Sequence, residues 1–123
     1  MPDLALELSA EPESAAAARR AVEGSLSLEG ETLETVKLLV SELVTNSVRH
    51  AGLPASAEIG LRVSAAEKLV RVEVTDAGPG FDPANLPEPS EAGGWGLRLV
   101  DAMADRWGVE LTPLVRVWCE LDR

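Results

Sequence analysis

The stretch TLETVKLLVSELVTNSVRHA, residues Thr32–Ala51, decides the fold, because it predicts one long amphipathic helix against which the other elements must pack. Gly52 and Pro54 follow it directly and end the helix. The positions that recur at helical spacing along one side of it are Leu33, Val36, Val40, Leu43, Val44, Ser47 and Ala51.

Shorter elements surround this helix. Leu4–Leu8 alternates apolar and other residues and predicts a strand, whereas Ser14–Val22 is rich in alanine and predicts a first helix that stops near Gly24. After the long helix, Ile59–Val63 and Val70–Val74 both alternate, so they predict a β-hairpin.

The second half of the chain begins with a long irregular segment, Ala77–Gly94, which is rich in proline and glycine. A third helix is expected over Leu97–Trp107, ended by Gly108, and a closing hairpin of Val109–Leu111 and Val115–Leu121. The order predicts an α+β two-layer sandwich, with a mixed, mostly antiparallel sheet and the helices packed on one face.

Composition limits the class of protein. The chain has 123 residues, which predicts a single domain over residues 1–123, and 46% hydrophobic residues provide a core. Eleven basic against 21 acidic residues give a net charge of −10, which disfavours direct binding to nucleic acid. No leader-like or membrane-spanning segment is visible and the single Cys119 allows no internal disulfide, so we expect a cytoplasmic protein without a membrane partner.

Three polar residues of the long helix, Glu42, Asn46 and Arg49, fall on one face, roughly opposite the apolar stripe. They are consistent with a solvated surface. They are also consistent with a catalytic site in which the amide oxygen of Asn46 binds Mg²⁺ and Glu42 accepts a proton from an attacking hydroxyl.

Asp76 follows an alternating strand and opens the sequence DAGPGF, residues 76–81. Such a sequence can be a simple turn. A carboxylate in this place can also accept a hydrogen bond from the exocyclic amine of adenine, where guanine presents an oxygen, and Gly78 and Gly80 would let the backbone approach a flat base.

The glycine cluster GGWGL, residues 93–97, lies directly before the third helix. It can be a hinge, or it can bring backbone amides to a phosphate at a helix N-terminus. It matches neither the dinucleotide-binding nor the P-loop pattern. Arg98, Asp101 and Asp105 on the same helix are expected to form a solvated charge pattern.

Taken in order, residues 42–51, 76–81 and 93–97 resemble the N, G1 and G2 boxes of the GHKL ATP-binding superfamily, over about residues 4–121. The short chain, together with NSVRHA at 46–51 and LVDAMADRWG at 99–108, resembles the actinobacterial anti-sigma-factor serine/threonine kinases.

This resemblance implies ATP and Mg²⁺ as cofactors, a sigma factor and an anti-anti-sigma antagonist as partners, and a homodimer as a common state. The antagonist would offer the serine or threonine that is phosphorylated. Glu42 would be the catalytic base and Asn46 the Mg²⁺ ligand. The nucleotide would be bound by Asn46, Arg49, Asp76, Gly78, Gly80, Gly94, Gly96 and Leu97.

Two positions depart from the family pattern. Arg116 stands where relatives often carry a threonine that helps to fix adenine, and Trp95 stands where many carry an arginine beside the phosphates. They keep open a second interpretation, in which the same fold is a protein-interaction module that binds nucleotide weakly or not at all. The catalytic half of a histidine kinase is a third, but this chain has no room for the adjoining dimerisation helices.

Overall fold

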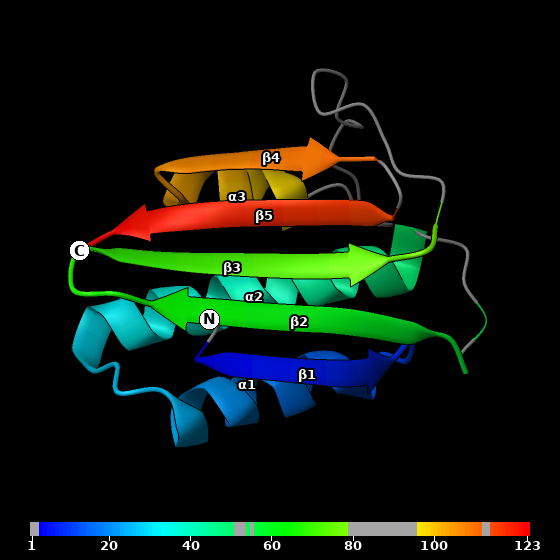
Figure 1. Cartoon of the computed structure of the whole chain (residues 1–123), viewed down its shortest axis with the longest axis horizontal. Coiled ribbons are helices and arrows are strands. Elements are labelled where there is room, and N and C mark those ends of the chain that lie inside the picture. The colour runs from blue at the N-terminus through cyan, green and yellow to red at the C-terminus, as the bar shows by residue number, and fades with distance from the viewer. Residues whose placement is uncertain (1–2, 51–53, 55, 79–95, 112–113) are drawn as a thin grey trace.

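The computed structural model describes residues 3–50, 54, 56–78, 96–111 and 114–123. The elements follow the order expected from the sequence (Figure 1). They are β1 (Leu4–Ser9), α1 (Glu13–Ser25), α2 (Gly30–His50), β2 (Glu58–Ala65), β3 (Leu69–Asp76), α3 (Gly96–Met103), β4 (Arg106–Glu110) and β5 (Val115–Asp122).

The strands form one sheet in the order β1-β2-β3-β5-β4, and each neighbouring pair of described strands is antiparallel. The prediction of a mixed sheet is therefore wrong for this part of the chain. The reason is the connections: α1 and α2 together bring the chain back to the end at which β1 finished, so β2 runs against β1, and the neighbouring pairs β2–β3 and β4–β5 are hairpins.

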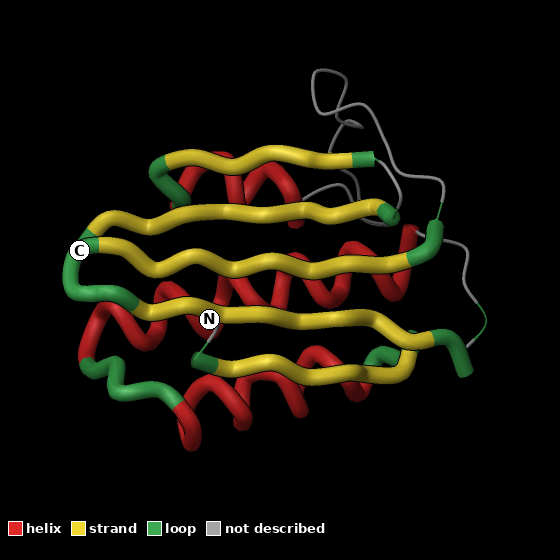
Figure 2. The backbone as a smooth tube through the Cα atoms, in the orientation of Figure 1, coloured by secondary structure: helices red, strands yellow, loops and turns green. Residues whose placement is uncertain are grey.

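The helices α1, α2 and α3 all cover the same face of the sheet (Figures 1 and 2). This confirms the predicted α+β two-layer sandwich. The core lies between the layers, where alternate residues of the strands meet the apolar stripe of α2. Its most deeply buried members include Leu39, Val40, Leu43, Val44, Ile59, Leu61, Val72 and Val74.

The third helix is shorter than predicted. It ends at Met103, and Trp107 and Gly108, which were expected to complete and cap it, lie in β4. Gly108 is the register partner of Trp118 on β5, and a Cβ on Gly108 would fall 2.8 Å from Cζ2 of that indole. Gly108 therefore leaves room for the Trp118 ring on the neighbouring strand, and it does not end a helix.

Asp101 and Asp105 are exposed, as the solvated pattern predicts, and each also accepts a hydrogen bond. The indole Nε1 of Trp107 donates to Oδ1 of Asp101 at 2.7 Å, and the backbone N–H of Asp122 donates to Oδ2 of Asp105 at 2.6 Å. Asp101 thus joins α3 to β4, and Asp105, in the turn after α3, joins that turn to β5.

Within the part of the chain that is described, no helix combines the length and the apolar character needed to cross a membrane.

Candidate functional site

The end of β3 meets the C-terminal part of α2 at Asp76. This residue is the last of β3, and the strand's alternation turns its side chain toward the helices, where it is 5% exposed. Ser47 Oγ donates to Oδ2 of Asp76 at 2.7 Å, and the backbone N–H of Gly78 donates to Oδ1 at 2.7 Å. Among the described residues each carboxylate oxygen thus has one donor, and a carboxylate can accept further donors from a ligand.

Glu42 and Asn46 lie one turn apart on α2 and are both half-buried, whereas Arg49 is exposed. Glu42 lies beside the start of α3, because a Cβ on Gly96 would fall 3.0 Å from its Oε2. The face that carries Glu42 and Asn46 is therefore partly covered. Of the three polar residues, only Arg49 is exposed as a solvated surface would require.

Two of the predicted nucleotide residues, Gly96 and Leu97, are the first residues of α3. Leu97 is 8% exposed and its side chain belongs to the core, so it can serve a nucleotide only through its backbone. Gly96 opens α3, where backbone N–H groups lack helical partners. Gly80, Gly94 and Trp95 lie outside the described residues, as does most of the segment Ala77–Gly94.

Asn46 and Glu42 are the side chains of this site that could help to hold a metal ion. The described residues contain no group of three or more histidine, cysteine, aspartate or glutamate side chains that could enclose a metal. Mg²⁺ is usually bound through one or two protein ligands, several waters and substrate phosphates. The amide oxygen of Asn46, with Glu42 one turn away, fits an ion that arrives with a nucleotide.

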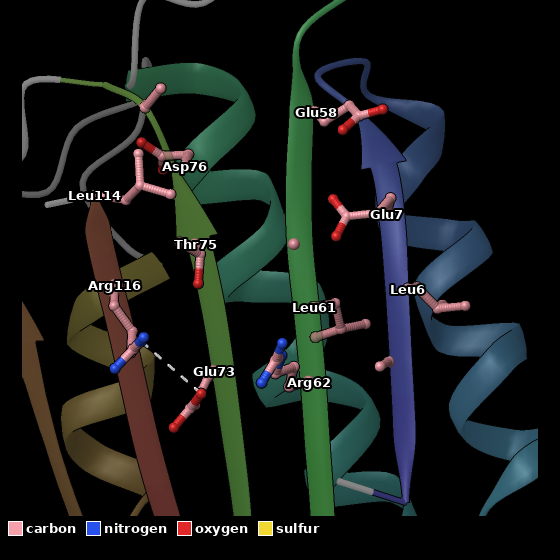
Figure 3. Close-up of a pocket in the computed structure, with 13 residues that line it drawn as sticks. Leu6, Glu7, Glu58, Leu61, Arg62, Glu73, Thr75, Asp76, Leu114 and Arg116 are labelled. Carbon is pink, nitrogen blue, oxygen red and sulfur yellow. Dashed lines mark ion pairs between the residues drawn. The ribbon is translucent and has the colours of Figure 1, made fainter.

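Arg116 lies on the other face of the sheet. The residue paired with Asp76 across β3 and β5 is Val115, which is buried, while Arg116 pairs with Thr75 and is exposed. Its guanidinium contacts Glu73 at 3.9 Å (Figure 3) and Glu110 at 3.0 Å. The departure that the sequence suggested at the adenine position therefore does not reach the carboxylate of Asp76.

The helix-free face of the sheet carries a hollow of about 490 Å³ (Figure 3). It lies over Gly60, whose missing side chain leaves a depression between Glu7 and Thr75. Charged side chains surround it, including Glu58, Arg62, Glu73 and Arg116. Asp76 also borders the hollow, but its carboxylate is bonded to Ser47 on the side of the helices, so we do not assign the nucleotide to the hollow.

Ser47 is the site residue that sequence reasoning missed. The signal was present: it is the polar position in the core-facing stripe of α2, where a hydroxyl needs a partner. Its partner, Asp76, is 29 residues away along the chain.

Comparison with known proteins places these features in a family. The family model described as the histidine kinase-like ATPase domain matches residues 8–115. A serine-protein kinase RsbW from Listeria monocytogenes is 33% identical over 118 residues, which cover 83% of this chain and 75% of that protein. The RsbW of Oceanobacillus iheyensis is 32% identical, covering 81% and 73%. The RsbW of Bacillus subtilis is 29% identical, covering 85% and 76%.

Proposed function

The chain belongs to the histidine kinase-like ATPase domain family, and from this premise we propose that it is an ATP-dependent serine/threonine protein kinase of the anti-sigma-factor type. The similar proteins that carry the name serine-protein kinase support the proposal. The observation that carries it is the arrangement of α2, in which Glu42 lies against the start of α3 and Ser47 holds Asp76 at the end of β3.

Asp76 would recognise the base. Each of its oxygens accepts one hydrogen bond from the described residues, and a further lone pair can accept the exocyclic amine of adenine. Guanine presents a carbonyl oxygen at the equivalent position, which a carboxylate repels. The buried position of Asp76 strengthens this discrimination, because an unpaired polar group is costly where water is excluded.

Glu42 would act as the general base, and Asn46 would hold the ion that accompanies the phosphates. When bound, Mg²⁺ neutralises charge on the phosphate oxygens. Glu42 takes the proton of the serine or threonine hydroxyl as that oxygen bonds to the γ-phosphorus, and the bond from the γ-phosphorus to the bridging oxygen of ADP breaks. The start of α3 supplies backbone N–H groups near the transferred group.

The protein substrate and the regulated partner follow from the motif resemblance. We propose that the kinase phosphorylates an anti-anti-sigma antagonist and that it binds a sigma factor, which it releases when the unphosphorylated antagonist takes its place. With these partners and ATP, we propose that the activity is cytoplasmic.

The test is phosphoryl transfer from labelled ATP to the cognate antagonist. The wild-type chain should label serine or threonine, and Glu42→Gln should abolish transfer while ATP affinity stays within about threefold, since a general base contributes roughly 10²–10⁴ to the rate. Glu34→Gln, on an exposed glutamate of the same helix, is the control and should transfer normally. Absence of label with a verified antagonist would remove the kinase proposal.

The interaction-module interpretation is the second candidate. Of its two supporting residues, Arg116 contacts Glu110 and Glu73 on the helix-free face, so the interpretation now depends on Trp95, outside the described residues. Calorimetry separates the two candidates: micromolar binding of Mg-ATP, about −8 kcal/mol, favours the kinase, and no binding favours the module.

A further inference from the structure

We propose that Ser47 is a positioning residue for base recognition: its hydroxyl fixes the carboxylate of Asp76 in the orientation that accepts the exocyclic amine, and so sustains selection of ATP over nucleotides that lack this amine. This inference rests on the proposed function. It adds a residue that the motif resemblance does not assign.

The contact is short and enclosed. Ser47 Oγ and Asp76 Oδ2 are 2.7 Å apart, and the two residues are 1% and 5% exposed. They come from α2 and β3, which are in direct contact in the core. Water therefore competes little for this hydrogen bond, and the geometry of one side chain depends on the other.

The direction of the hydrogen bond is fixed by chemistry. A carboxylate only accepts, so the Ser47 hydroxyl donates its one proton to Asp76. A serine within a helix can instead bond to the carbonyl four residues earlier, and that alternative is not used here. The Ser47 hydroxyl is thus bonded to the end of β3 and not to the backbone of its own helix.

Removing this donor would leave Asp76, within the described part of the chain, with only the hydrogen bond from the N–H of Gly78. The terminal torsion of an aspartate is broad and roughly two-fold, so one remaining hydrogen bond permits several orientations of the carboxylate. A ligand donor would then have to order the carboxylate on binding, which costs affinity. No buried side-chain nitrogen or oxygen of the described residues lacks a partner at present, so the loss would also create one.

A purely structural role for Ser47 makes a different prediction. If the hydrogen bond only joined α2 to β3, its loss would weaken every nucleotide alike or lower stability alone. If the hydrogen bond orients the Asp76 carboxylate, its removal should lower the affinity only for nucleotides that carry the exocyclic amine. Mg-ITP is the probe for this difference, because its base carries an oxygen in place of the amine.

The experiment is calorimetric titration of the full chain with Mg-ATP and Mg-ITP. Ser47→Ala should weaken ATP binding about tenfold, the scale of a lost hydrogen bond to a charged group, and leave ITP within about twofold. Ser41→Ala is the control, because Ser41 is a half-buried serine of the same helix that accepts a hydrogen bond from Arg19 at 2.7 Å, away from Asp76. It should not change the ATP-to-ITP ratio.

A second pair keeps the test decisive if Ser47→Ala folds poorly. Ser47→Thr and Ser47→Val have the same shape and differ in the hydroxyl, so the threonine variant should retain the preference for ATP and the valine variant should lose it. Equal losses for both nucleotides, or an unchanged ratio in both Ala and Val variants, would overturn the inference. A wild-type chain that binds ATP no better than ITP would instead overturn base recognition by Asp76, and the inference with it.

Discussion

Gly96 leaves the space that Glu42 occupies. A Cβ on this first residue of α3 would lie 3.0 Å from Oε2 of Glu42 and 3.8 Å from its carbonyl oxygen. The position of the proposed base thus depends on a glycine 54 residues away in the sequence. Because glycine has no side chain, this position leaves room for the carboxylate of Glu42, and it would also let a phosphate approach the backbone closely.

Gly96→Ala should therefore displace the carboxylate of Glu42 and lower the rate of phosphoryl transfer about tenfold or more, because a general base acts only within hydrogen-bond reach of its proton. Stability should fall by less than about 1 kcal/mol, since the clash is with the flexible end of a side chain and alanine favours helix. Single-turnover transfer measures the rate, and urea unfolding measures the stability. Gly24→Ala in α1 is the control, because nothing lies within 4 Å of a Cβ there. A normal rate of transfer in Gly96→Ala would show that the position of Glu42 does not depend on Gly96.

Gly108→Ala should destabilise the sheet by about 1–3 kcal/mol, the usual cost of forcing an extra carbon into a packed site. A Cβ there would lie 2.8 Å from Cζ2 of Trp118, and this ring also contacts the guanidinium of Arg71, 4.5 Å from its centroid. The indole therefore has little freedom to yield. Urea unfolding should show the loss, and a second substitution, Trp118→Leu, should relieve part of it. Additive losses in the double variant would contradict a direct clash.

The sequence was sufficient to predict the elements whose pattern is local. The alternation of β2 and β3, the stripe of α2 and the carboxylate at the end of β3 all depend on neighbours in the chain, and the structure has them where they were expected. The predicted end of α3 was wrong because Met103 and Trp107 are four residues apart. This spacing fits one continuous helix as well as a helix that ends and is followed by a strand. Only the pairing of β4 with β5 separates the two.

The site was less predictable because it depends on long-range register. The sequence alone could not say which of Val115 and Arg116 faces Asp76, since a shift of one residue reverses every side chain of a strand. The same limit hid Ser47, whose partner is defined only when α2 lies on β3. The residue types of a site can be read locally, but their contacts need the fold.

Glu120 should give the folded state a dependence on acid pH. It accepts hydrogen bonds from Arg106 and from Arg71, each at 2.9 Å, and these two guanidinium groups lower the pKa of its carboxyl below the usual 4.5. A lowered pKa in the folded state means that stability is present above pH 4.5 and is lost as the pH falls through the folded-state value. Urea unfolding between pH 6 and pH 3 should show this loss, and Glu120→Gln should show a smaller slope.

The control for this prediction is Glu67→Gln, on an exposed residue between β2 and β3, which should keep the wild-type slope. Salt provides a second check. Because these ion pairs are partly exposed, the difference between wild type and Glu120→Gln at neutral pH, about 1 kcal/mol or less, should shrink in concentrated salt. Parallel pH profiles for wild type and Glu120→Gln would show that the guanidinium contacts add nothing to stability.

The rate at which the Cys119 thiol is alkylated should show whether the core around it is folded or open. Its side chain faces the helices from β5 at 1% exposure, and burial raises the pKa of the thiol to about 12. At pH 8 the folded protein should react with iodoacetamide far more slowly than the urea-unfolded chain, because the thiolate is the reactive form and the thiol is enclosed. Leu114→Cys in a Cys119→Ala background places a thiol at a 48%-exposed position and should react rapidly. Equal rates for Cys119 in folded and unfolded chains would contradict the buried placement.

The raised pKa of Cys119 also predicts a loss of stability at alkaline pH. The unfolded chain releases the thiol proton near pH 9.0, whereas the folded chain retains it to about pH 12, so stability falls as the pH rises between these values. Cys119→Ala removes this contribution, and its stability should fall less than that of the wild type over pH 9 to 10.5 in urea unfolding. If the two slopes are equal, the thiol ionises as readily in the folded chain as in the unfolded chain, and β5 cannot present it to the core as the register with β3 requires.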